Sequence, residues 1–189
     1  MFVEYDKKEG QKKERMARMT GEERRNRILT MLKEQESALS GTALANEFHV
    51  SRQVIVQDIA LMRAESHDIL STNRGYLYRK AEADTSMPKR VFHVRHSTEQ
   101  VLQEFLTITE LGGKVLDVVV EHEIYGQIRV DLLIENSRDA REFYEKLIHS
   151  KDNPLMVLTD DCHYHTVAAP SEKLLELIRQ ELDNKGYLL

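Results

Sequence analysis

The hydrophobic pattern of this 189-residue chain is lost over residues 81–90 (AEADTSMPKR), which contain Pro88. A break of this kind between two patterned stretches is typical of a linker, and the chain is long enough for two small domains. We therefore expect a charged extension at residues 1–21, a first domain at 22–80, the linker, and a second domain at 91–189.

The first domain carries helical patterns separated by a tight turn. After one helix through RRNRILTMLKEQ, the stretch GTALANEFHVSRQVIVQDIALMR predicts a short helix, a turn near His49, and a second helix with Ser51 as its N-cap. The next segment, DILSTNRGYLYRK, has two β-prone runs around Asn73-Arg74-Gly75, which predicts a hairpin. A helix-turn-helix followed at once by a hairpin is a winged helix.

The charge of the chain is unevenly distributed. Residues 1–80 hold 15 Lys and Arg against 12 Asp and Glu, a net charge of +3, whereas residues 81–189 hold 12 against 20, a net charge of −8. DNA binding draws much of its affinity from Lys and Arg that face phosphates. A basic N-terminal part joined to an acidic C-terminal part therefore indicates a nucleic-acid-binding module coupled to a domain of another kind.

In a helix-turn-helix, the second helix enters the major groove of DNA with its solvent face. Here that face is predicted to begin with Arg52, Gln53 and Gln57, and Arg and Gln side chains suit the edges of guanine and adenine. Arg74 and Tyr76 of the hairpin are placed to meet phosphates or the minor groove. The alternative is that this outer face of the helix is merely solvated.

The second domain alternates strands and helices. Strands are predicted at VFHVRH, KVLDVVVEH, QIRVDLLIE, PLMVL and CHYHTV, and helices at STEQVLQEFLTITEL, residues 137–148 and residues 171–184. This order predicts an α+β fold, a small sandwich in which the helices cover one face of the sheet.

A pair of histidines in the second domain is a candidate metal-binding site. His163 and His165 stand two apart in a predicted strand, so they project from the same face. Neutral imidazoles side by side form a natural metal-binding pair. The chain has one cysteine and no CxxC motif, so it offers no thiolate zinc site, and nitrogen and oxygen ligands are expected. Cys162 should point away from His163 on the strand and be buried as packing, not bind the metal. A half-exposed strand that happens to carry two histidines is the alternative.

Both halves of the chain resemble known families. The stretch LANEFHVSRQVIVQDIALMR is similar to the helix-turn-helix of bacterial repressors of the DeoR and biotin-operon type, with His49 at a turn position where that pattern usually has Gly. The stretches VRHSTEQVLQEFLTITELGGKVLDVVVEHEIYGQIRVDLLI, NPLMVLTDDCHYHTVAAP and KGYLL resemble the 3H domain. The whole chain resembles the niacin-responsive repressors of the NiaR family, which join a winged helix to a 3H domain.

This resemblance implies a divalent metal, with nickel or zinc favoured, bound by His96, Glu104, His163 and His165. Spacing alone does not lead to Glu104, because eight residues of helix span roughly 10–12 Å along the axis. His93 is the nearest competitor among the histidines, but strand alternation makes it face away from His96.

The resemblance also implies that His122 and Tyr125 lie near the metal, as contacts to an effector or as neighbours of the ligands. A role in the turn between two strands is the alternative for both. Two departures from the family pattern fall nearby: Glu123 stands where a proline is common, and Asp160-Asp161-Cys162 replaces a more aliphatic stretch.

For function, the resemblance implies a homodimeric DNA-binding repressor of niacin-uptake or NAD-synthesis genes, with nicotinic acid as co-repressor. One alternative is a regulator for which the metal ion itself is the signal. Another is a metalloenzyme, but the chain has no H-E-x-x-H, nucleophile or phosphate-loop motif, so we expect no enzyme. No apolar run approaches the roughly 18 residues of a membrane span, and the charged N-terminus is unlike a signal peptide. We therefore expect a cytoplasmic protein without a membrane partner.

Overall fold

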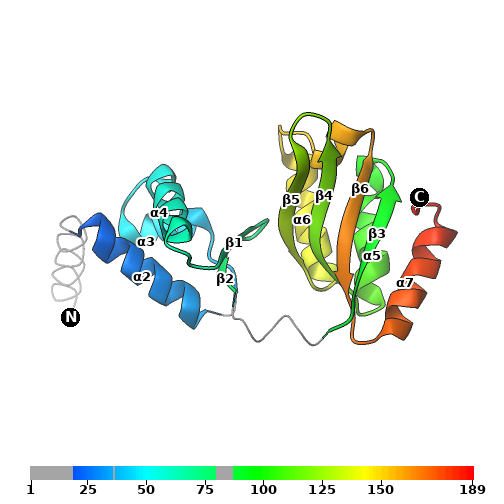
Figure 1. Ribbon diagram of the computed structural model, residues 1–189, viewed down its shortest axis with the longest axis horizontal. Helices are drawn as coiled ribbons and strands as arrows, with labels where there is room; N and C mark the ends of the chain where they lie inside the picture. The colour runs from blue at the N-terminus through cyan, green and yellow to red at the C-terminus, as the bar shows by residue number, and fades with distance from the viewer. Residues whose placement is uncertain (1–18, 36, 80–86) are drawn as a thin grey trace, which may run out of the picture. The chain divides into compact units, whose positions relative to one another are not determined.

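The computed structural model describes residues 19–35, 37–79 and 87–189. It divides into two compact units, residues 1–81 and 82–189 (Figure 1). Most of the predicted extension, residue 80 of the predicted first domain and residues 81–86 of the predicted linker lie outside the described residues. Lys89 and Arg90, which the sequence placed in the linker, instead begin a strand, because their backbones pair with Ala168 and Val167.

The first unit is a winged helix, as predicted. Its helices are α2 (Gly21–Glu34), α3 (Gly41–Phe48) and α4 (Arg52–Ala64), and the antiparallel strands β1 (Ile69–Thr72) and β2 (Gly75–Tyr78) form the hairpin. Its core gathers apolar side chains from all three helices and from β1: Ile28, Leu32, Leu44, Phe48, Ile55, Ile59, Met62 and Ile69.

Side-chain caps fix where these helices begin. Thr20 and Glu23 form a capping box at α2, and the hydroxyls of Ser40 and Ser51 accept backbone N–H groups at α3 and α4. Between α3 and α4, His49 adopts the left-handed conformation with φ of 53°, one that non-glycine residues adopt only uncommonly. The tight turn predicted at this position is therefore present.

The hairpin is attached to the segment that precedes α3. Leu39 and Tyr76 exchange two backbone hydrogen bonds of 2.9 Å. Gly75 has φ of +135°, and a Cβ there would lie 2.3 Å from the Leu39 carbonyl oxygen. Only glycine permits this approach, so the residue fixes the hairpin against the helical body.

The second unit is an α+β sandwich, as predicted. Its antiparallel strands lie in the order β5-β4-β6-β3. The elements are β3 (Lys89–Arg95), α5 (Val101–Glu110), β4 (Lys114–His122), β5 (Gly126–Ile134), α6 (Ser137–His149), β6 (Cys162–Ala168) and α7 (Glu172–Asn184). Figure 1 shows α5 and α6 behind the sheet and α7 beside β3. All three helices contribute to one core, which lies against one face of the sheet.

One predicted strand is wrong. Leu155–Thr159, which covers all of the PLMVL run except Pro154 and adds Thr159, forms a 3₁₀ helix and not a strand. Met156 alone of the five is fully buried, while Val157 and Leu158 are 46% and 52% exposed. A short apolar run does not by itself distinguish a strand from a helical turn, and Asp160 and Asp161 then adopt left-handed conformations that turn the chain into β6.

The helices of both units are short. The longest in the described ranges, α2, has 14 residues. Within the parts of the chain that the structure describes, no helix is long and apolar enough to cross a bilayer.

Candidate functional site

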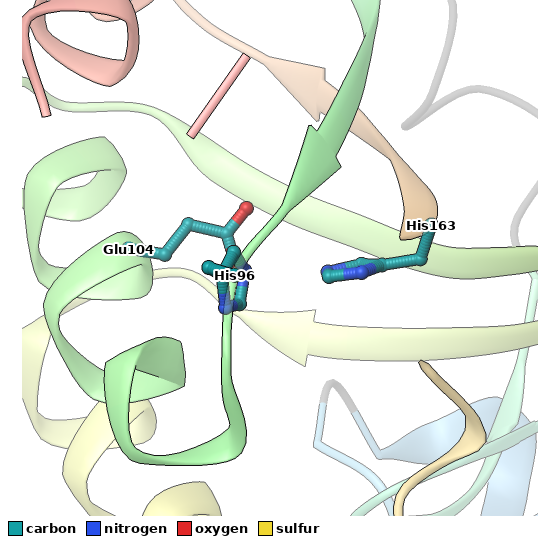
Figure 2. A group of neighbouring side chains, drawn as sticks. All are labelled: His96, Glu104 and His163. Carbon is teal, nitrogen blue, oxygen red and sulfur yellow. The ribbon is translucent and has the colours of Figure 1, made fainter. Parts of the chain in front are cut away.

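Three elements bring the four predicted metal ligands to the helix-covered face of the second sheet. His96 follows β3, Glu104 lies on α5, and His163 and His165 lie on β6. All four are buried, with exposed fractions of 0–5%. Figure 2 shows the His163 ring pointing from β6 toward His96 and Glu104.

The carboxylate of Glu104 is the centre of this cluster. Its Oε2 lies 2.9 Å from Nε2 of His96 and 3.4 Å from Nε2 of His165. Candidate ligand atoms of His96, Glu104 and His163 all lie within 4.8 Å of one another. The ring of His165 packs edge-on against that of His163, with 4.8 Å between centroids. The candidate ligand atoms of His96, Glu104 and His163 are therefore close enough to share one ion, and His165 adjoins this group through its contacts with Glu104 and His163.

Backbone carbonyls set the orientation of the three imidazoles. In each ring Nδ1 lies at hydrogen-bond distance from a main-chain oxygen. For His96, His163 and His165 these oxygens belong to Ser97, Asp161 and Asp117, at 3.0, 3.0 and 2.5 Å. A carbonyl only accepts, so Nδ1 carries the proton. In the neutral ring the lone pair is then on Nε2, the atom a metal would bind.

Burial and charge perturb these groups in different directions. Burial lowers the pKa of His163 to about 4, and the charge of His165 adds to this effect. Burial opposes the charged forms of His96 and His165 as well, but the neighbouring Glu104 carboxylate outweighs it and raises both pKa values. For Glu104 itself, burial is outweighed by His165 and His96, and its pKa is lowered. Glu104 is thus held as an anion among imidazoles.

The residues fit a divalent cation. Oε1 of Glu104 is buried and has no hydrogen-bond partner in the described structure. A buried carboxylate oxygen without a partner is costly in protein alone. Three imidazoles, each with an Nε2 lone pair in its neutral form, and a carboxylate are also the ligand types that zinc, nickel and related ions accept. A cation would supply the missing partner of Oε1.

His122 and Tyr125 lie together in the turn between β4 and β5. Nδ1 of His122 accepts hydrogen bonds from the backbone N–H groups of Ile124 and Tyr125, and the two rings are 4.8 Å apart. Strand alternation puts His122 on the face of β4 that also carries Val118, which packs against the core of the second unit. Tyr125 is 76% exposed. The pair is organised around the turn and does not touch the four clustered residues in the described structure.

Two residues that were predicted not to bind the metal, His93 and Cys162, lie outside the cluster. His93 stacks on Tyr164 at 4.2 Å between centroids, on the other face of the sheet. Cys162 is half-buried, not fully buried as expected, and its Sγ faces the Asp160 carbonyl.

Asp117 is a residue of the site that sequence reasoning missed. Its carbonyl holds His165, its Oδ1 accepts the Thr166 N–H at 2.8 Å, and its Oδ2 lies 2.9 Å from Arg129. It is 1% exposed and sits at an irregularity in the pairing of β4. The signal that could have found it is a lone acidic residue inside the apolar run KVLDVVVEH.

The predicted DNA-reading residues of α4 are on the surface. Arg52, Gln53 and Gln57 are all exposed, whereas Ile55 and Ile59 are buried. In the hairpin, Arg74 is exposed at the turn, and Tyr76 is half-buried against the core of the first unit. Its ring and the Arg52 side chain both approach Gly41. Four of the five predicted DNA-binding residues are therefore exposed, whereas Tyr76 also packs against the core of the first unit.

A buried ion pair, also missed from the sequence, supports α4. Nε of Arg24 on α2 lies 2.6 Å from Oδ2 of Asp58, and its Nη2 lies 3.2 Å from Oδ1. The Asp58 side chain is 3% exposed, and Arg25 approaches it to 3.7 Å. An acidic residue on the apolar face of α4 was the available signal, because such a group requires a partner.

Both units match families of known proteins. Residues 24–77 match the model of an HTH domain, and residues 89–189 match that of the 3H domain. The chain is 37% identical over 168 residues to the probable transcription repressor NiaR of Thermotoga maritima, which covers 89% of this chain and 94% of that protein. It is 35% identical over 173 residues to the transcription repressor NadR of Bacillus subtilis, covering 91% and 96%.

Proposed function

This chain belongs to the NiaR-type family of transcription repressors, and we propose that it represses genes of niacin uptake or NAD synthesis with nicotinic acid as co-repressor. A transcription repressor is a DNA-binding protein and not an enzyme, so the metalloenzyme alternative is set aside. In this proposal the winged helix reads the operator, and the 3H domain senses the effector at a metal site.

The observation that supports the effector site is the convergence of His96, Glu104, His163 and His165 in a buried cluster with an unpartnered carboxylate oxygen. The three Nε2 atoms and Glu104 would hold a divalent nickel or zinc ion. When bound, the ion offers a further position that accepts a pyridine nitrogen or a carboxylate, both of which nicotinic acid carries.

The chain's own residues prepare this site. The carbonyls of Ser97, Asp161 and Asp117 orient the imidazoles before the ion arrives, so little rotamer freedom is lost on binding. The surrounding core keeps water from competing for the ligands. His122 and Tyr125 stay proposed neighbours of the effector, held at the β4–β5 turn.

Repression further requires two copies of the reading helix. We take the functional unit to be a homodimer whose α4 helices meet half-sites about 34–36 Å apart. Nicotinic acid acts as co-repressor only if it binds the DNA-competent arrangement more tightly than the other.

The test is nicotinic acid binding measured by calorimetry on metal-loaded and chelator-stripped protein, with metal content determined by elemental analysis. We expect one metal per chain and nicotinic acid binding that depends on it. If stripped protein bound nicotinic acid with the same affinity, the metal would not be part of the effector site.

The alternative of a metal-responsive regulator predicts a different result on chelation. If the ion itself is the signal, chelation lowers DNA affinity even when no nicotinic acid is present. In our proposal chelation without nicotinic acid leaves DNA affinity nearly unchanged, because the winged helix lies outside the metal site.

A further inference from the structure

The C-terminal residues 187–189 form a short strap along β3. Gly186, with φ of +71°, ends α7, and the N–H of Tyr187 donates to the Leu182 carbonyl at 3.0 Å. The strap then pairs with the strand: Arg95 N–H donates to the Tyr187 carbonyl at 2.8 Å, and Leu189 N–H donates to the His93 carbonyl at 3.0 Å. These bonds fix the position of Tyr187 although it lies almost at the chain end.

The side chain of Tyr187 is turned to the metal cluster. It is 5% exposed, and its ring lies 5.2 Å from the His96 ring at an angle of 55°. Burial and the negative charge of Glu104 both raise the pKa of its phenol. The structure describes no hydrogen bond of this hydroxyl with residues 87–189.

Unlike Oε1 of Glu104, the hydroxyl oxygen of Tyr187 is not fully buried, so it can meet a ligand that reaches the edge of the cluster. The cluster beside it consists of three imidazoles and a carboxylate that would bind the ion, and the Tyr187 hydroxyl is a neutral donor at its edge. We propose that Tyr187 is an effector-binding residue: its ring packs beside His96, and its hydroxyl donates a hydrogen bond to the carboxylate of a planar heteroaromatic acid held at the cluster. This inference rests on the proposed function and names the residue that selects an acid over an uncharged ring.

The test compares wild-type protein, Tyr187→Phe and the matched control Tyr164→Phe, which removes a hydroxyl on the opposite face of the same sheet. Calorimetry of metal-loaded protein measures the affinity for nicotinic acid and for pyridine, which lacks the carboxylate, and a separate titration measures metal affinity. We expect Tyr187→Phe to bind nicotinic acid about 10- to 100-fold more weakly, as for a lost hydrogen bond to a charged group. Its affinities for pyridine and metal should match wild type, as should every affinity of Tyr164→Phe.

Unchanged nicotinic acid affinity in Tyr187→Phe, while wild type binds, would overturn the inference and leave the proposed function standing. A loss of metal affinity in Tyr187→Phe would also overturn it, because the phenol would then serve the ion. Absence of nicotinic acid binding in wild type would defeat the proposed effector and the role assigned to Tyr187 together.

Discussion

Nε2 of His96 lies 2.9 Å from Oε2 of Glu104, although eight positions separate the two residues in the sequence. The chain reverses between them. Ser97 and Gln100 form a capping box, a 3₁₀ turn spans Thr98–Gln100, and α5 then runs back beneath the sheet that His96 has just left. The axial distance along a continuous helix does not apply, because His96 lies directly after β3 and before the 3₁₀ turn.

The paired histidines of β6 should be required for metal binding. Replacing His163 and His165 together by Gln removes two of the three Nε2 donors, so metal uptake should be abolished while the domain stays folded. Elemental analysis and circular dichroism check this. His93→Gln, on the opposite face, is the control and should keep its metal. Full occupancy in the double variant would rule out the site.

The exposed side chains at the start of α4 should contribute to operator affinity. Arg52→Ala and Gln57→Ala should each weaken operator binding by about 1–3 kcal/mol, the range for one lost base contact, without changing the melting temperature. Fluorescence anisotropy with labelled operator measures this. Arg138→Ala, an exposed arginine of the second unit, serves as the matched control. Operator affinity that is unchanged in both α4 variants would exclude α4 as the reading helix.

The Arg24–Asp58 pair should stabilise the winged helix. Arg24→Met leaves the buried Asp58 carboxylate with only Arg25 at 3.7 Å, so unfolding free energy should drop by roughly 3 kcal/mol, the lower end for a broken buried pair. Urea denaturation monitored in the first unit measures the loss. An exposed pair is expected to contribute at most about 1 kcal/mol, so Arg79→Ala, which removes the exposed Arg79–Asp68 pair of the same unit, provides the comparison. A loss no larger than in that control would show that the pair is not structural.

Acid should destabilise the metal-free second domain through His163. Its pKa is lowered to about 4 by burial and by His165, whereas an unfolded chain has histidine near 6.5. Between these values the unfolded state binds more protons, so this contribution to stability is full above about pH 6.5 and is lost as pH falls toward about 4. His96 and His165, with raised pKa values, contribute stability below about pH 6.5 that is lost at higher pH.

Comparing variants isolates the His163 contribution. In the presence of a chelator, His163→Gln should lose up to about 3 kcal/mol less unfolding free energy than wild type between pH 6.5 and 4. His149→Gln, at an exposed histidine of α6, should follow wild type. Parallel pH profiles for wild type and His163→Gln would contradict the buried, neutral state of this imidazole.

Local sequence signals were sufficient for most of the fold. Ser51 as a cap, the Asn73-Arg74 turn and the His163–His165 alternation each depend on neighbours within a few residues, and the structure has all three. The 3₁₀ helix at Leu155–Thr159 was missed because a five-residue apolar run carries no period.

The site was harder to predict because its contacts are not local. Glu104 came only from family resemblance, since a reversal of the chain brings it to His96. Asp117 is 48 residues from His165 in the sequence and reaches it through an irregularity in strand pairing. Tyr187 is 91 residues from His96 and reaches it through the C-terminal strap. No periodicity in one sequence encodes such pairings.

The central claim is that nicotinic acid, held at the metal cluster, controls DNA binding by the winged helix. The direct measurement is operator affinity of metal-replete protein with and without nicotinic acid, using DNA that the protein has selected from a random pool. The account predicts that nicotinic acid tightens operator binding by about 1–3 kcal/mol, and that operator tightens nicotinic acid binding by the same factor. Substitution of His96 and Glu104 should erase this coupling. Equal operator affinity with and without nicotinic acid would contradict the account.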